Sequence, residues 1–338
     1  MSWIGLDIGG AQTKLSNGSQ LAISRSFPLW RRPDALADLL QELLDGQIPD
    51  ASLAVTMTGE LADCYRTKRE GVDRILKSVE SAAAGRDISV YLTDGTFVSP
   101  DEARDRHLQA AAANWHALAK YCTRLTENSS ALLIDIGSTT ADIIPLDAGG
   151  PCPDGLTDPN RLASGELVYT GVRRSPVCAV TNTLPWKGKQ CGVAQELFAT
   201  TWDAYLVLDE LPEEPDAATT ADGRPATKDA AHDRLARCIC ADREMFDVDD
   251  ALAAAQAIEK AQLAKLGLAA VGVMRGLSQP PRTIILSGSG EFLARKLVAK
   301  LRLKDVQVIS LAEQFDNAEI SRSATALAVA VLAEEAAE

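Results

Sequence analysis

Residues 7–14 read Asp-Ile-Gly-Gly-Ala-Gln-Thr-Lys and residues 135–142 read Asp-Ile-Gly-Ser-Thr-Thr-Ala-Asp, so nearly the same phrase occurs twice. Each copy follows an apolar run, at 3–6 and at 131–134, that predicts a buried strand. The glycine and hydroxyl residues after each aspartate predict a tight turn with exposed backbone N–H groups. An aspartate in this place can hold a hard cation such as Mg²⁺, while the N–H groups receive phosphate oxygens. The repeat predicts two related lobes that close on one phosphorylated ligand.

Composition limits the classes of partner. A chain of 338 residues is long enough for about two domains. Its net charge of −13 argues against a nucleic-acid or anionic-membrane partner, because both require a basic face. The seven cysteines are dispersed and lack zinc-site spacing, which indicates reduced thiols. The sequence starts with strand-like residues and shows no basic segment or cleavage site typical of secretion, so we expect a cytoplasmic protein. A homodimer is compatible with the sequence.

Strands alternate with helices along the chain, and this order predicts an α/β architecture. We expect a first lobe over 1–127 and a second over 128–338, with the last helix as a candidate to cross back to the first lobe. Residues 150–235 lack clear periodicity and predict an irregular insertion, whose acidic part, 209–233, is expected at the surface. Further expected elements are a helix ending at Gly46, a strand at 52–57, a helix at 70–84, a strand at 88–92, a helix at 110–121, a helix at 249–277, a strand at 283–286, a helix at 291–302, a strand at 306–309 and a helix at 318–336.

A third turn, Ser-Gly-Ser-Gly at 287–290, follows the expected strand at 283–286. Three such turns in this order resemble the actin-like ATPase and sugar-kinase superfamily. The resemblance implies two ribonuclease-H-like lobes with a cleft between them, each with a phosphate hairpin that contains an aspartate. It also implies that the third turn approaches a nucleoside. The candidate phosphate-binding residues of the three turns are Gly9, Gly10, Ala11, Gln12, Thr13, Lys14, Gly137, Ser138, Thr139, Thr140, Gly288 and Ser289.

The metal-ligand candidates under this resemblance are Asp7 and Asp135, each at the end of its strand. Asp142 is a third candidate because it alternates with Thr140 along a strand and so can face the same cleft. The alternative for the first two aspartates is an Asx-turn that only caps the hairpin. Lys14 can meet a phosphate or take part in catalysis, and the alternative for Lys14 and Asp142 is a solvated side chain.

Three further segments supply candidates for catalysis and substrate binding. Glu60 follows the strand at 52–57, near the place where sugar kinases keep a general base. The alternative for Glu60 is a solvated loop glutamate. His116 is a second candidate for the base, and its alternative is a structural histidine. Asn114 and Trp115 precede His116 in an alanine-rich helix. The substrate-binding candidates are Asn114, Trp115, Arg161, Gly165 and Glu166.

A narrower resemblance rests on longer phrases. These include residues 7–14, Thr-Met-Thr-Gly-Glu-Leu-Ala-Asp at 56–63, Ala-Ala-Asn-Trp-His-Ala at 112–117 and the stretches at 135–145 and 161–171. Together they resemble the hydantoinase/oxoprolinase-related proteins of the tetrahydromethanopterin-linked one-carbon pathway, whose archaeal members include an enzyme of methanofuran biosynthesis. The family's first phrase more often has asparagine at the position of Gln12.

This resemblance implies a transferase that joins an aminomethylfuran-methyl diphosphate to the phenol oxygen of a tyramine or γ-glutamyltyramine acceptor and releases pyrophosphate. It implies Mg²⁺ as the cofactor, with the organic diphosphate and the phenolic amine as partners. The alternative is an ATP-dependent kinase or a hydantoinase/oxoprolinase-like hydrolase with the same fold, and only this alternative requires ATP. A third class is a non-catalytic, actin-like assembly module.

Overall fold

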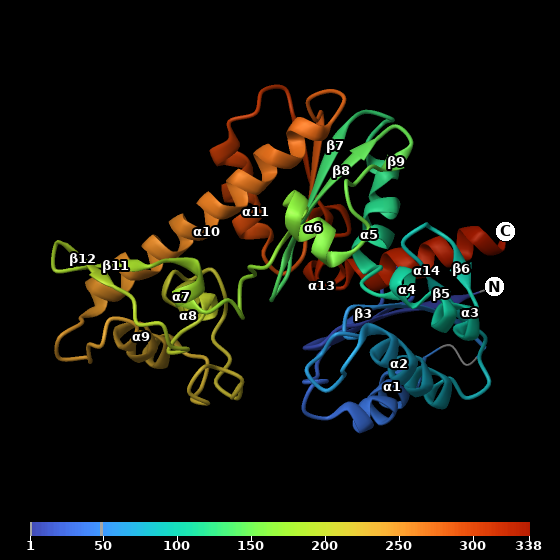
Figure 1. The fold of residues 1–338 in the computed structure, drawn as a ribbon, viewed down its shortest axis with the longest axis horizontal. Helices are drawn as coiled ribbons and strands as arrows, with labels where there is room; N and C mark the ends of the chain where they lie inside the picture. The colour runs from blue at the N-terminus through green and yellow to red at the C-terminus, as the bar shows by residue number, and fades with distance from the viewer. Residues whose placement is uncertain (1, 48–49) are drawn as a thin grey trace.

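The computed structural model describes residues 2–47 and 50–338. Within these residues, two mixed β-sheets lie in separate lobes with helices between them (Figure 1). The first sheet has the strand order β3 (Ala22–Ser26), β2 (Gln12–Ser16), β1 (Trp3–Ile8), β4 (Ser52–Met57), β5 (Ile88–Tyr91) and β6 (Phe97–Val98). The second has the order β10 (Leu167–Val168), β8 (Ala141–Asp147), β7 (Ala131–Ile136), β13 (Thr283–Ser287) and β14 (Gln307–Ser310), with β9 (Gly150–Pro151) paired to β8.

The two sheets repeat one arrangement of strands. In the first, β1 forms an antiparallel hairpin with β2 and a parallel pair with β4. In the second, β7 forms an antiparallel hairpin with β8 and a parallel pair with β13. Asp7 lies opposite Lys14 in the first hairpin, and Asp135 lies opposite Asp142 in the second. The predicted α/β class with two related lobes is therefore confirmed.

Helices cover both faces of each sheet. In the first lobe, α1 (Leu36–Leu44) and α2 (Lys68–Ala82) pack on one face and α14 (Ala324–Ala337) packs on the other (Figure 1). In the second lobe, α10 (Val248–Gly276) and α11 (Glu291–Leu301) cover one face, and α5 (Asn114–Cys122) lies at the other face against α14. The shorter helices are α3 (Pro100–Asp105), α4 (His107–Ala110), α6 (Asp158–Ser164), α7 (Val177–Val180), α8 (Thr201–Val207), α9 (Lys228–Arg237), α12 (Leu311–Gln314), α13 (Ala318–Arg322) and the 3₁₀ turns η1 (Pro33–Ala35) and η2 (Thr123–Leu125).

Helix α14 is apolar on nearly all sides because it packs between the first sheet and α5. Its contact with β1 is close: a Cβ atom built at Gly5 would lie 1.9 Å from the carbonyl oxygen of Ala326. The glycine therefore permits the backbone of the strand to touch the backbone of the helix. Among the described residues, no helix is long and apolar enough to cross a lipid bilayer.

Two helices expected to be continuous are interrupted. The helix predicted at 110–121 divides into α4 and α5, because Ala112 has a φ of +50° and Ala111 forms a parallel bridge with Met57. The helix predicted at 318–336 divides into α13 and α14 at Ser323. Alanine favours helix wherever it stands, so an alanine-rich run does not reveal where tertiary contacts interrupt it.

The segment expected to be irregular, 150–235, contains α6, α7, α8, α9 and the hairpin of β11 (Thr183–Trp186) and β12 (Lys189–Gly192). Much of it extends away from the second lobe along one half of α10 (Figure 1). This subdomain has a core of its own, formed by side chains that include Val177, Leu184, Leu235 and Phe246 together with Ile258 of α10. Few of its helices are longer than two turns, which explains why periodicity failed to reveal them.

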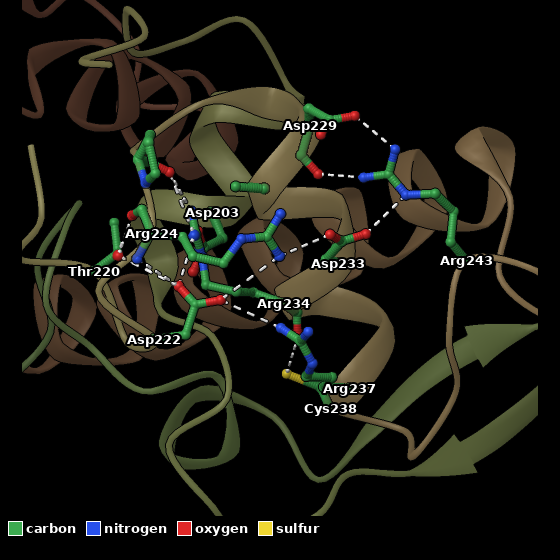
Figure 2. Close-up of polar contacts among 12 residues, drawn as sticks. Asp203, Thr220, Asp222, Arg224, Asp229, Asp233, Arg234, Arg237, Cys238 and Arg243 are labelled. Carbon is green, nitrogen blue, oxygen red and sulfur yellow. Dashed lines mark hydrogen bonds and ion pairs between the residues drawn. The ribbon is translucent and has the colours of Figure 1, made fainter. Parts of the chain in front are cut away.

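Ion pairs attach the acidic part of this segment to α9. The fully buried guanidinium of Arg234 lies 2.7 Å from Asp203 and 3.0 Å from Asp222, and Arg237 also contacts Asp222 (Figure 2). Burial raises the pKa of Asp203 to about 6, although Arg234 opposes the shift. The prediction of an acidic surface segment at 209–233 thus did not include Arg234, the buried cation that pairs with Asp222 of this segment.

The close contact at Gly5 predicts that Gly5→Ala destabilises the protein. The added methyl group must push α14 away from β1, at a cost of about 3 kcal/mol in the free energy of unfolding. Urea unfolding measures this loss. The control is Gly272→Ala on α10, where a Cβ meets no atom within 4 Å and should stabilise the helix slightly. Equal stability of the Gly5→Ala variant and the wild-type protein would contradict the contact.

Candidate functional site

The two phrases of the sequence form two equivalent turns. In the first, the amide of Gly9 donates to the carbonyl of Gln12 at 2.9 Å. In the second, the amide of Gly137 donates to the carbonyl of Thr140, also at 2.9 Å. Each turn follows a strand that ends near an aspartate, so Asp7 and Asp135 have the same local position in the two lobes.

Asp7 is held by elements from distant parts of the chain. Its Oδ2 atom accepts a hydrogen bond from the hydroxyl of Thr325 on α14 at 2.5 Å and from the amide of Asn114 on α5 at 3.3 Å. The ammonium of Lys14 lies 3.5 Å from the same oxygen. The other oxygen, Oδ1, is buried and has no hydrogen-bond partner within the described part of the chain. An acceptor of this kind is available to a cation or to a donor on a ligand.

The pKa of Asp135 depends on charged groups from both lobes. Burial raises its pKa to about 6, Lys14 opposes this shift, and Asp142 and Asp7 add to it. The charged groups of both hairpins therefore influence the ionisation of Asp135, and Lys14 is the cation among them. Gly288 packs against Asp135, since a Cβ at Gly288 would lie 2.5 Å from Asp135 Oδ1. The structure places Lys14 beside Asp7, and the charge of Lys14 also acts on the ionisation of Asp135.

Asp142 already has a partner. Arg161 is buried, and its Nη2 atom lies 2.9 Å from Asp142 Oδ1. The guanidinium of Arg161 also stacks on the ring of Trp115, with 3.8 Å from Cζ to the ring centroid. Arg161 thus joins the other two predicted site residues, Asp142 through an ion pair and Trp115 through a cation–π contact. The structure thus favours a structural role for Asp142, Arg161 and Trp115 over direct metal or substrate binding.

The first hairpin leaves donors unused. Within the described residues, the N–H groups of Gly10 and Ala11 have no hydrogen-bond acceptor. A Cβ at Gly10 meets no atom within 4 Å, so this turn faces open space. Thr13 is fully buried, and its hydroxyl oxygen has no hydrogen-bond partner within the described residues. The free N–H groups beside Lys14 suit an anion such as a phosphate.

The second hairpin is supported from behind by residues 170–174. The carbonyl of Ser138 accepts from the amides of Arg173 and Arg174, both at 3.0 Å. A Cβ at Gly171 would lie 2.5 Å from Thr139 N. Gln262 of α10 donates to the carbonyl of Gly171 at 2.9 Å and so holds this loop in place. Sequence reasoning missed Gln262, and a single glutamine in an alanine-rich helix carries no signal of its burial.

The third turn differs from the expectation for phosphate binding. The amide of Gly288 donates to the hydroxyl of Ser321 at 3.1 Å, and the amide of Gly290 donates to the carbonyl of Ile136 at 2.8 Å. Its two glycine amides are thus used within the protein. Only Ser289 of this turn keeps its predicted role open. Gly288 instead permits the close contact with Asp135, at a φ of +91° that favours glycine.

Glu60 is buried at the boundary between the lobes. It follows β4, and the amide of its neighbour Gly59 donates to the carbonyl of Ile8 beside the first hairpin. Burial raises the pKa of Glu60 to about 7, although Lys68, 3.5 Å from Oε1, opposes the shift. A carboxyl group with a pKa near neutral can accept a proton at the pH of the cell. Lys68 was not among the residues predicted from the sequence.

Three other candidates have structural contacts. His116 pairs its Nδ1 atom with the hydroxyl of Tyr91 at 2.9 Å, and burial lowers its pKa to about 4. Gly165 ends α6 with a φ of +83°. The carboxylate of Glu166 accepts hydrogen bonds from the amides of Asp154, at 2.6 Å, and Gly155, at 3.3 Å. The geometry therefore favours Glu60 over His116 as the base. Gly165 ends a helix, and Glu166 holds the loop at 154–155 in place.

The described residues contain no group of three or more histidine, cysteine, aspartate or glutamate side chains that could hold a metal ion alone. Mg²⁺ does not require such a group, because it binds through one or two carboxylates, water and substrate phosphates. The buried Oδ1 atom of Asp7 has no hydrogen-bond partner among the described residues, so Asp7 can supply one such carboxylate.

Comparison with known proteins gives the family. Residues 52–336 match the hydantoinase/oxoprolinase family, and the chain belongs to it. It is 34% identical over 334 residues to a (4-{4-[2-(γ-L-glutamylamino)ethyl]phenoxymethyl}furan-2-yl)methanamine synthase of Methanocaldococcus jannaschii, with 97% of this chain and 96% of the relative covered. It is 29% identical to a synthase of the same name from Methanococcus vannielii, over 61% of this chain and 91% of the relative.

Solved structures support the fold. The chain resembles a protein of the PilM–PilN type IV pilus biogenesis complex with a TM-score of 0.51 and 14% identity, over 98% of both chains. It resembles a putative N-acetylmannosamine kinase from Listeria monocytogenes with a TM-score of 0.50 and 13% identity, over the full length of both chains. The fold is that of the actin-like ATPases and sugar kinases, as the three turns predicted.

The raised pKa of Glu60 predicts a pH-dependent loss of stability. The carboxyl is neutral in the folded state up to about pH 7, but it ionises near its ordinary value of 4.5 when the chain unfolds. Its stabilising contribution is thus fully present below about pH 4.5 and is lost as the pH rises through 7. Because glutamine cannot ionise, the Glu60→Gln variant should gain on the order of 3 kcal/mol relative to the wild-type protein between pH 4.5 and 7.

Urea unfolding at several pH values measures this difference. The control is Glu42→Gln, because the side chain of Glu42 on α1 is mostly exposed and should show no such gain. Parallel pH profiles for the wild-type protein and the Glu60→Gln variant would exclude a raised pKa at Glu60.

Proposed function

We propose that this protein is a transferase that forms an aryl ether in the synthesis of a methanofuran-type cofactor. It joins the methyl carbon of an aminomethylfuran-methyl diphosphate to the phenol oxygen of a γ-glutamyltyramine-type acceptor. The names of the two relatives describe such a phenoxymethyl-furan product. The observation that carries the proposal is the arrangement of Asp7, Lys14 and Asp135 beside the free N–H groups of the first hairpin.

This arrangement suits a diphosphate. The N–H groups of Gly10 and Ala11 can donate to phosphate oxygens, and the ammonium of Lys14 adds positive charge beside them. A Mg²⁺ ion held by Asp7 and Asp135 would stabilise the charge that develops on the leaving group. The net charge of the chain is strongly negative, so binding of an anionic substrate depends on these local donors.

The reaction exchanges one C–O bond for another. The bond between the furan-methyl carbon and the diphosphate oxygen breaks, and its electron pair leaves with pyrophosphate. The phenol oxygen forms the new bond to that carbon and gives up its proton. Glu60 can take this proton, since its pKa is about 7 and the backbone of its neighbour Gly59 is hydrogen-bonded to Ile8 beside the first hairpin. The side chains thus have separate tasks: the hairpins bind the leaving group and Glu60 accepts the proton.

The direct test is product analysis. Incubation of the protein with the furan-methyl diphosphate, γ-glutamyltyramine and Mg²⁺, without ATP, should yield the ether and an equal amount of pyrophosphate. Mass spectrometry identifies the ether and a phosphate assay measures the pyrophosphate.

Lys14→Met should lower kcat/KM by about two orders of magnitude, because it removes a cation at the leaving group. Lys265→Met, at an exposed position on α10, is the matched control and should leave kcat/KM unchanged. ATP turnover that requires Asp7, with an inert furan diphosphate, would show a kinase or hydrolase instead.

Gly10 tests the place of the phosphate. A Cβ at this position meets no protein atom, so Gly10→Ala should leave the free energy of unfolding unchanged. The same methyl group should block the close approach of a phosphate and weaken the binding of pyrophosphate with Mg²⁺ by about tenfold, or about 1.4 kcal/mol. Isothermal titration calorimetry measures the affinity, and Gly149→Ala, also in open space, is the control. Equal affinity in both variants would place the phosphate elsewhere.

A further inference from the structure

Glu60 is nearly inaccessible in this structure. The residue is 1% exposed, and its Oε2 atom has no hydrogen-bond partner among the described residues. Its backbone is fixed by α2, because a Cβ at Gly71 would lie 1.9 Å from the carbonyl oxygen of Glu60. A substrate can therefore reach the carboxylate only if the groups around it move. The charged group that contacts the carboxylate is Lys68, which belongs to the same lobe.

Lys68 joins two carboxylates from different lobes. It is the first residue of α2 in the first lobe, and its Nζ atom lies 3.5 Å from Glu60 Oε1. The same atom lies 2.7 Å from Oδ2 of Asp158, the first residue of α6 in the second lobe. The lysine side chain is 18% exposed and that of Asp158 is 26% exposed, whereas the Glu60 side chain is only 2% exposed. The cation thus favours the carboxylate of the opposite lobe over the carboxylate of its own.

We propose that Lys68 and Asp158 are positioning residues that make Glu60 a stronger proton acceptor when the two lobes close. This proposal rests on the proposed function, in which Glu60 accepts the phenol proton. Glu60 and Lys68 belong to the same lobe and stay close in every arrangement of the lobes. Asp158 belongs to the other lobe and reaches Lys68 only when the lobes are together, as they are in this structure.

Lobe separation removes Asp158 and leaves Lys68 with Glu60 as its carboxylate partner. The ammonium then stabilises the ionised form of Glu60, which favours a carboxylate that is ready to receive a proton. Lobe closure draws the ammonium to Asp158 and encloses the carboxylate, and both changes raise its affinity for a proton. The phenol thus reaches the carboxylate while the lobes are apart, and its proton passes to Glu60 as the lobes close on the bound substrate.

The charged groups that face Glu60 in the described structure are Lys68 and Asp158. Its other close neighbours, Gly59 and Gly71, carry no charge. Substitution of the two charged residues should therefore shift the ionisation of Glu60 in opposite directions. Asp158→Asn returns Lys68 to Glu60, whereas Lys68→Met removes the cation altogether. A purely structural role for this ion pair predicts loss of stability in both variants without opposite shifts.

The test is the pH dependence of kcat for pyrophosphate release by the protein, because kcat reports the ionisation of groups in the complex with substrate. The acid limb of the wild-type profile should lie near pH 7. Asp158→Asn should move it down by about one pH unit and Lys68→Met should move it up by about one unit. Asp73→Asn is the matched control, because it removes a carboxylate partner of Lys77 on the same helix and should leave the profile unchanged.

A second readout does not require turnover. Carbon-13 NMR of labelled glutamate, with Glu60→Gln to assign the signal, follows the ionisation of Glu60 in each folded variant. Opposite shifts of this signal with no ether product would support the control of Glu60 ionisation by Lys68 and Asp158 and would refute the proposed function. Ether formation would leave the proposed function intact, whereas shifts of the Glu60 signal in the same direction, or in neither variant, would overturn its control by Lys68 and Asp158.

Discussion

Two carboxylates, Asp7 and Asp135, belong to the equivalent hairpins of the two lobes, and the rest of the site depends on how their repulsion is balanced. Lys14 supplies the opposing charge, and the hairpin places it there, because Lys14 lies opposite Asp7 in the antiparallel register. The second hairpin has Asp142 in the equivalent place, and that carboxylate is neutralised from behind by Arg161. The two hairpins share a shape but differ in charge.

The local part of this arrangement could be predicted from the sequence. A strand, a turn and a returning strand depend on neighbouring residues, so the apolar runs and glycines of residues 3–16 and 131–147 were sufficient to predict both hairpins. The same holds for α10 and for β13, whose patterns are continuous. The three turns in order also indicated the superfamily, because two of them begin with the same residues, Asp-Ile-Gly, after a buried strand.

The contacts that complete the site could not be predicted in this way. Thr325 is 318 positions from Asp7 in the sequence, and Asp158 is 90 positions from Lys68. Such pairs depend on how whole elements pack, and a polar residue on a helix looks the same in the sequence whether it faces solvent or a buried carboxylate. For the same reason His116 was a reasonable candidate for the base until its contact with Tyr91 was known.

The packing of α14 on β1 has a consequence for the order in which the protein folds. The strand at Trp3–Ile8 is synthesised long before the helix that covers one face of its sheet, Ala324–Ala337. Until that helix is made, the face around Gly5 exposes apolar side chains. The lobe that is translated first is therefore completed last. This long delay between synthesis and burial makes the nascent first lobe a natural client for chaperones.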